Sequence, residues 1–369
     1  RGERIDRLGS SAQLLLLADD NTVITDLQGK TLLPGFVDAH GHFPGSGLAA
    51  LTVDLSSPPV GTVHDMAELQ QRLAAKLAGK DETHWLAGFG YDDTLLTEKR
   101  HPTRDDLDAV SSTVPIYVTH VSGHMGVANS RALALLDITS ASENPIGGVI
   151  VRRPGSQEPE GLLEETAHMA AVANAMRFSM LDSLRMAKAA SDEYVAVGVT
   201  TAQSGGTDAS MGAGLATLVE YQLIKPRLVI FPWYNQWGPQ LLSGDADASS
   251  LNSDRVMIGP IKFVADGSIQ GYTGYLSEPY YVPYKGDEDY RGYPAIPRED
   301  LIRIVADFHR AGFQLAIHGN GDASIDDILD AFALAQAEHP VADPRLIVIH
   351  AQMARDDQLL RMKQLGVTP

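Results

Sequence analysis

The feature that most limits how this chain can fold is an apolar run ending in two histidines one residue apart, Leu32 to His42. Its first part, Leu32 to Val37, predicts a short buried strand. Side chains at positions i and i+2 of an extended segment lie on the same side, so His40 and His42 can point at one metal ion. Neutral imidazole is a common zinc ligand. The alternative is that both histidines are polar loop residues, because the pattern is short.

The composition limits which side chains can hold such a metal. The 369-residue chain has no cysteine, so a metal site must use histidine, carboxylate or a modified side chain. With 47 acidic and 29 basic residues the net charge is −18, which disfavours nucleic acid as a partner. No apolar run approaches the roughly 20 residues that span a bilayer, so we expect no membrane partner. No signal-peptide pattern opens the sequence, and we expect a cytoplasmic location, although a leader could precede Arg1.

From about residue 198 onward, short apolar strands alternate with helices. We expect strands at Val199–Gln203, Arg227–Trp233, Val256–Val264, Gln314–His318 and Leu346–His350. We expect helices near 210–224, 298–311, 323–338 and 356–365. This alternation predicts parallel βα units, and therefore an α/β fold. With the strand before His40 the count is six, and residues 366–369 resemble the start of a seventh.

A long segment, about 43–195, separates the first strand from the next convincing one. A βα unit needs far fewer residues, so we expect an insertion at the catalytic face or a subdomain. Within it we expect strands at Trp85–Phe89 and Ile116–Thr119 and helices near 65–79, 161–175 and 180–197. Before the first strand, residues 11–31 alternate in a β manner and predict strands at Leu14–Leu17 and Val23–Thr25.

Three polar residues lie on or end the otherwise apolar strands of the second half: Lys262, His318 and His350. Because the active site of a parallel barrel lies at the carboxyl ends of its strands, these are candidate functional residues. Each has another explanation. The histidines could be hydrogen-bonded loop residues, and Lys262 could form a salt bridge with Asp266.

Several motifs together resemble one known family. The run "LLPGFVDAHGHF" resembles the first-strand signature of the amidohydrolase superfamily, whose members hold one or two divalent metals in a (β/α)8 barrel. The stretches "HVSGHMGVANSRAL" from His120 and "PEGLLEE" from Pro159 resemble the amidohydrolase 3 group. The resemblance implies a TIM-like barrel beside a small β-sandwich, both incomplete in these residues. Residues 1–33 would be part of the sandwich, and residues 34–369 would hold barrel strands one to six and the start of the seventh.

The same resemblance implies a set of metal ligands. The order His-x-His, Lys, His, His falls on strands one, four, five and six, as in binuclear amidohydrolases. It implies one or two divalent ions, expected to be zinc, held by His40, His42, Lys262, His318 and His350. A free ammonium has no lone pair, so Lys262 is expected to carry a carboxylate made from CO2. A metal-binding Asp is expected on an eighth strand, so we expect the functional protein to continue past Pro369.

The resemblance also implies a reaction, hydrolysis of a C–N bond in an amide, an N-substituted formamide or a cyclic amide by metal-bound water. His318 and His124 are expected to be catalytic, and His124, Asn129 and Asp322 to contact a small-molecule substrate. Asn129 could instead cap the helix that follows it. An ester hydrolase on the same metal site and a catalytically silent scaffold are the alternatives. A homodimer is one expectation for the assembly.

Overall fold

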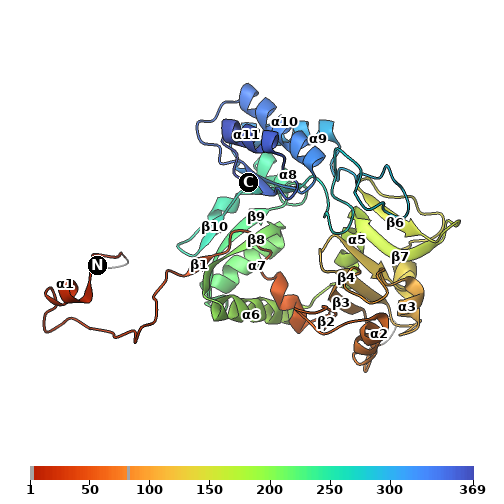
Figure 1. The fold of residues 1–369 in the computed structure, drawn as a ribbon, viewed down its shortest axis with the longest axis horizontal. Helices are drawn as coiled ribbons and strands as arrows, with labels where there is room; N and C mark the ends of the chain where they lie inside the picture. The colour runs from red at the N-terminus through yellow and green to blue at the C-terminus, as the bar shows by residue number, and fades with distance from the viewer. Residues whose placement is uncertain (1–3, 81–83) are drawn as a thin grey trace. The chain divides into compact units, whose positions relative to one another are not determined.

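The computed structural model describes residues 4–80 and 84–369 and divides into two compact units, Arg1–Gly35 and Phe36–Pro369 (Figure 1). In residues 4–35 the only regular element is the helix α1 (Ser11–Leu15), which Ser10 and Gln13 cap reciprocally. The strands predicted within residues 11–31 are therefore wrong, because local capping favours a helix and no sheet pairs with the apolar residues. The assignment of residues 1–33 to a sandwich stays a prediction.

The second unit contains a series of parallel strands that follow the order of the chain. One sheet consists of β1 (Phe36–Val37), β8 (Val199–Thr207), β9 (Arg227–Pro232) and β10 (Val256–Ile258). A second sheet consists of β11 (Ile261–Val264), β12 (Leu315–Gly319) and β13 (Ile347–His350). A parallel bridge between Trp233 and Lys262 joins the sheets, and Thr368 pairs in parallel with Ile347. The predicted α/β fold with a TIM-like parallel barrel is confirmed. The assignment of residues 34–369 to barrel strands one to six and the start of a seventh stays a prediction.

Two predicted strands differ from the structure. β1 has only two residues, and Phe36 and Val37 are exposed rather than buried. The single strand predicted at Val256–Val264 is two strands, β10 paired with β9 and β11 paired with β12. The interruption falls at Gly259-Pro260, where proline has no N–H to donate to a strand neighbour.

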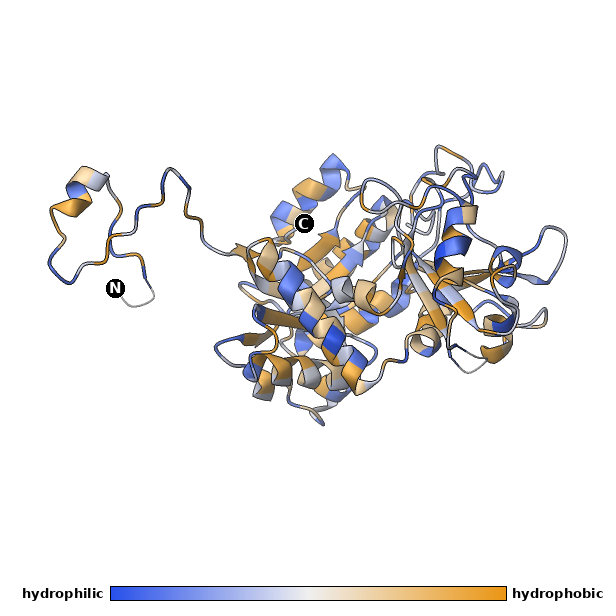
Figure 2. Cartoon of the chain, turned by 90° about the horizontal axis from the view of Figure 1, so that it is seen from below, coloured by the Kyte–Doolittle hydropathy of each residue, from blue (hydrophilic) through white to orange (hydrophobic). Residues whose placement is uncertain are grey.

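Helices follow most of these strands, as the sequence predicts. They are α6 (Met180–Ala196), α7 (Ala209–Glu220), α8 (Gly238–Ser243), α9 (Arg298–Arg310), α10 (Asp322–Glu338) and α11 (Asp356–Leu365), with the 3-10 turn η2 (Ala248–Leu251). Strand and helix side chains form one core that includes Ile230, Phe263, Ile317 and Phe332. Figure 2 shows the strands as mainly apolar and the helices as mixed, which is the pattern of a parallel sheet covered by helices. Among the described residues no helix is long and apolar enough to cross a membrane.

The insertion between β1 and β8 has its own six-stranded sheet, in the order β2-β3-β4-β5-β7-β6. The strands are β2 (Val53–Asp54), β3 (Leu86–Tyr91), β4 (Ile116–His120), β5 (Met125–Ala128), β6 (Gly148–Arg152) and β7 (Pro159–Glu165). The remaining elements are η1 (Gly45–Ala50), α2 (Met66–Ala74), α3 (Arg104–Asp108), α4 (Ser130–Leu135) and α5 (Thr166–Ala175). The helix predicted near 161–175 is wrong for residues 161–165, which pair antiparallel with β5 and β6.

A core substitution tests this packing. Phe263 is fully buried on β11, stacks on Tyr234 at 4.7 Å between ring centroids and meets Phe308 edge-on. We expect Phe263→Ala to lower the free energy of unfolding by about 3–5 kcal/mol, because it leaves a cavity. Urea denaturation measures this change. Met257→Ala, on the exposed side of β10, is the control and should cost less than about 1 kcal/mol. Equal costs for the two variants would contradict the described core.

Candidate functional site

Four histidines from three barrel strands lie together at the carboxyl ends of those strands. His40 and His42 follow β1, His318 lies on β12 and His350 ends β13. The ring centroids are 5.0 Å apart for His40 and His42, 5.3 Å for His40 and His350, and 4.6 Å for His318 and His350. We call these four residues the histidine cluster. The structure brings together all four histidines that the sequence analysis named as metal ligands.

Lys262 belongs to the same place. It is 1% exposed on β11, and its Nζ is buried without a hydrogen-bond partner in the part of the chain that the structure describes. Burial lowers its pKa to about 7, and its charge contributes to the lowered pKa values of the nearby histidines. Among the described residues no ion pair joins Lys262 to Asp266, whose carboxylate instead accepts the backbone N–H groups of Asn320 and Gly321. The salt-bridge alternative for Lys262 is therefore not what the structure contains.

Hydrogen bonds determine which ring nitrogen of two histidines is free. Gln203 Oε1 lies 2.6 Å from His40 Nδ1, and the same oxygen accepts the N–H of Gly41, so His40 donates from Nδ1. His40 Nε2 then carries a lone pair, and it is buried without a hydrogen-bond partner from any described residue. His318 donates from Nε2 to the carbonyl of Gly267 at 3.0 Å, which leaves a lone pair on Nδ1.

These free lone pairs fit a metal centre. A buried polar atom without a hydrogen-bond partner is rare in native proteins, and a bound water or ion is one explanation for it. Here two such atoms, His40 Nε2 and Lys262 Nζ, belong to one group of side chains. Ligand imidazoles in metal sites usually donate their second ring nitrogen to a protein acceptor, as His40 does to Gln203. Gln203 carried no signal in the sequence beyond its position on a strand.

The insertion contributes a further histidine, His124, whose ring centroid lies 5.0 Å from that of His318. Its Nδ1 lies 2.9 Å from Oε2 of Glu165. Burial lowers the pKa of His124, but the Glu165 carboxylate outweighs burial and the net pKa is raised. Glu165 was not among the predicted site residues. It ends the "PEGLLEE" motif, so that motif was the signal that could have found it.

Two other predicted residues are engaged by the protein itself. Asn129 is fully buried and caps α4: its oxygen accepts the N–H of Ala132 and Ile116, and its nitrogen donates to two carbonyls. The structure supports this capping alternative and leaves the Asn129 amide no free atom for a substrate.

Asp322 accepts hydrogen bonds from Ser277 and Arg355 on the wall of a cleft of about 720 Å³. Its substrate-binding role stays a prediction.

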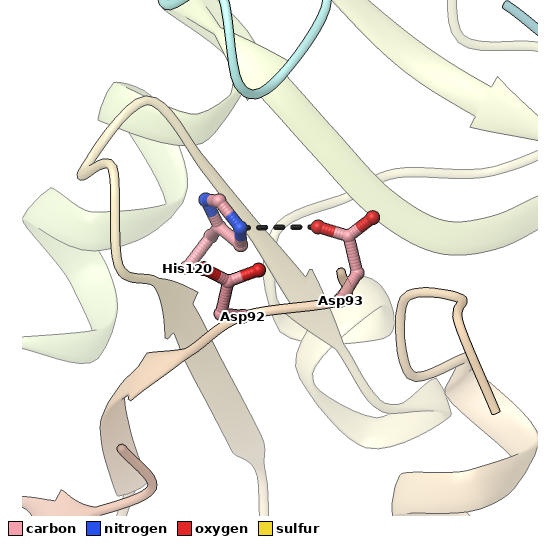
Figure 3. A group of neighbouring side chains, drawn as sticks. All are labelled: Asp92, Asp93 and His120. Carbon is pink, nitrogen blue, oxygen red and sulfur yellow. Dashed lines mark ion pairs between the residues drawn. The ribbon is translucent and has the colours of Figure 1, made fainter. Parts of the chain in front are cut away.

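A second group of potential ligands lies in the insertion, at the ends of β3 and β4 (Figure 3). Among residues 4–80 and 84–369, only Asp92, Asp93 and His120 place three such ligand atoms within 4.8 Å of one another. His120 Nδ1 accepts the N–H of Ser122, so the neutral ring carries its proton on Nε2. That nitrogen faces Asp93 Oδ1 at 3.1 Å. Among the described residues both of these atoms are buried without a hydrogen bond of acceptable geometry, so this group is a second candidate for a divalent ion.

Comparison with known proteins places the chain in one family. Residues 23–369 match the model of a family described as the amidohydrolase family. The chain belongs to this family. It is 28% identical over 371 residues to the N-substituted formamide deformylase of Arthrobacter pascens, covering 99% of this chain and 67% of that protein. It is also 28% identical over 379 residues to Protein LONG AFTER FAR-RED 3 of Arabidopsis thaliana, covering all of this chain and 63% of that one.

A solved structure of an uncharacterized metal-dependent hydrolase from Pyrococcus furiosus is similar along the whole chain. Its TM-score is 0.65 at 26% identity, and the match covers 100% of this chain and 70% of the other. This chain therefore spans about two thirds of the length of such relatives. Relatives and structure together support the predicted amidohydrolase resemblance, which is confirmed at the level of the family.

Gly267 offers a test of how closely this site is packed. A Cβ built on Gly267 would collide with Oε1 of Glu165 and Oγ1 of Thr273. We expect Gly267→Ala to lower the free energy of unfolding by about 1–3 kcal/mol, because the overpacked side chains must move. Gly214→Ala on α7 is the matched control, since nothing lies within 4 Å of its Cβ. It should be neutral or stabilising by up to about 1 kcal/mol. Thermal unfolding of both variants measures this, and an unaffected Gly267→Ala would contradict the packing.

Proposed function

We propose that this protein is a metal-dependent hydrolase that cleaves a carbon–nitrogen bond in an amide, an N-substituted formamide or a cyclic amide. The observation that carries the proposal is the pair of buried nitrogens without partners, His40 Nε2 and Lys262 Nζ, among four neighbouring imidazoles. Membership of the amidohydrolase family and the metal-dependent Pyrococcus relative support metal chemistry. The formamide deformylase relative supports the choice of bond.

The histidine cluster would hold one or two divalent ions. Zinc suits neutral imidazole ligands, and the chain has no cysteine to provide thiolates. His40 offers Nε2 and His318 offers Nδ1, because their other nitrogens already donate hydrogen bonds. A bound divalent cation supplies Lewis-acid activation of water and of the substrate carbonyl.

Lys262 would enter the metal site as a carbamate. Burial brings its pKa to about 7, so a large share of the side chain is neutral amine near neutral pH. A neutral amine attacks the carbon of CO2, a C–N bond forms, one proton leaves, and the product is a carboxylate. That conversion gives the buried nitrogen an anionic end suited to a cation, which an ammonium group lacks.

Other residues of the site would bind the substrate and stabilise the negative charge that develops on its carbonyl oxygen. In the overall reaction a water oxygen bonds to the carbonyl carbon, the C–N bond breaks, and the nitrogen leaves with a proton. His124 and His318 are the proposed catalytic residues. His318 would act as a metal ligand through Nδ1, because its Nε2 already donates to Gly267. His124 would stabilise the negative charge that develops on the carbonyl oxygen by donating from Nε2 in its protonated form, which the Glu165 carboxylate favours. The cleft beside Asp322 is walled by Ile269, Leu276 and tyrosines, and it would accept an apolar substituent on the substrate nitrogen.

Metal analysis tests the proposal first. We expect protein purified without chelator to contain about one or two equivalents of zinc per chain. His40→Ala should lose most of it, because a ligand lone pair is removed, whereas His64→Ala, an exposed histidine of the insertion, should keep it. Elemental analysis gives the readout. Less than about 0.2 equivalents, without recovery on adding zinc, would refute the metal centre and favour the silent scaffold.

Substrate profiling tests which bond is cleaved, and labelling with CO2 tests whether Lys262 carries a carbamate. We expect zinc-loaded protein to hydrolyse N-substituted formamides faster than matched formate esters, and Lys262→Ala to lower kcat/KM at least about 100-fold. After incubation with ¹³C-bicarbonate, wild-type protein should show a carbamate carbon signal that Lys262→Ala lacks. Lys363→Ala, on the end of α11, is the control and should keep the signal. Faster ester turnover would overturn the choice of bond, and a missing carbamate in active protein would overturn the role of Lys262.

A further inference from the structure

We propose that Glu165 is a positioning residue that acts on the reaction only through His124, by fixing which nitrogen of that ring is left for the substrate. The inference rests on the hydrolase function proposed above, with His124 as a catalytic residue. Neither the amidohydrolase resemblance nor the predicted ligand set assigns a role to Glu165.

The side-chain contact sets the tautomer of His124. The two carboxylate oxygens of Glu165 lie 2.9 and 3.2 Å from Nδ1 of His124. An ionised carboxylate only accepts hydrogen bonds, so the proton of the neutral ring is on Nδ1. Among the described residues Nε2 of His124 has no hydrogen-bond partner. It is therefore the nitrogen available to a substrate.

The backbone holds the same two residues in register. The N–H of Glu165 donates to the carbonyl of His124 at 2.8 Å, and the next pair along, Met125 and Glu164, is aligned between β5 and β7. Glu165 has a φ of 49°, which a non-glycine residue rarely adopts, at the turn from β7 into α5. Both the backbone and the side chain of Glu165 therefore fix His124.

The pair lies against the histidine cluster. Glu165 is 4% exposed, and its Oε1 lies so close to Gly267 that a Cβ added there would collide with it. The carbonyl of Gly267 accepts the hydrogen bond from His318, whose ring centroid is 5.0 Å from that of His124. The insertion thus places the pair of Glu165, at the end of β7, and His124 beside His318, which is a proposed metal ligand on the barrel strand β12.

The adjacent residue provides a matched control. Glu164 is as buried as Glu165, but it lies on the other side of β7 and accepts hydrogen bonds from Tyr284 and Tyr293. Changing Glu164 removes a buried carboxylate from the same strand without touching His124. It separates loss of a buried charge from loss of the His124 contact.

A double-mutant cycle on the zinc-loaded protein tests the action through His124. We expect Glu165→Ala to lower kcat by about 10–100-fold with little change in KM and no loss of zinc. In the His124→Ala background the same change should alter kcat by less than about twofold, because its only target is gone. Glu164→Ala should leave kcat within about threefold. A tenfold further loss in the His124→Ala background would overturn the proposal.

A second measurement does not depend on turnover. In ¹⁵N-histidine-labelled protein, assigned with His124→Ala, we expect His124 to show a protonated Nδ1 in wild type and Glu164→Ala. Glu165→Ala should show a mixture of tautomers, and Glu165→Gln, which keeps an accepting oxygen, should retain the wild-type form. A protonated Nε2 in wild type, or no change in Glu165→Ala, would overturn the proposal. If the wild type shows this signature but no turnover, the hydrolase function fails while the positioning of His124 stands.

Discussion

A buried amino group without a partner is the constraint on which the rest of this site depends. Lys262 lies on β11, between Trp233 after β9 and Ala316 on β12, and it is 1% exposed. A charged ammonium in such a place would be strongly unfavourable unless paired. Within residues 4–80 and 84–369 no carboxylate pairs with it, and burial lowers its pKa to about 7. Burial is tolerated when the Lys262 nitrogen is a neutral amine, or when it carries a carboxylate that faces a cation. The surrounding imidazoles are suitable ligands for such a cation.

The imidazoles around Lys262 share one pattern of hydrogen bonding. Three of them, His40, His318 and His124, each donate one ring nitrogen to a protein acceptor and keep the other nitrogen free. The acceptors come from three different elements: Gln203 on β8, the carbonyl of Gly267 after β11, and Glu165 on β7. Because a neutral imidazole has one donor and one acceptor nitrogen, each acceptor decides the chemistry of its ring. The barrel and the insertion therefore specify the site jointly.

The sequence predicted what depends on short-range pattern. The βα alternation predicted the parallel strands, and the polar residues that interrupt apolar strands predicted Lys262, His318 and His350. It did not predict the division at Gly259-Pro260, although the proline was a visible signal, because the rest of that run is apolar on both sides of it. The strands predicted in residues 11–31 were wrong because alternation alone does not supply a pairing partner. Glu165 and Gln203 were missed because their contacts with His124 and His40 form only where segments distant in the sequence meet.

X-ray diffraction at the zinc absorption edge, from crystals of the zinc-bound protein, tests the central claim most directly. The account predicts an anomalous peak within bonding distance of His40 Nε2, about 2.0–2.1 Å, with Lys262 reaching toward the same ion through added carboxylate density. A peak between Asp93 and His120 with none at the histidine cluster would contradict it. So would a fully occupied cluster in which Lys262 remains a bare amine remote from the metal.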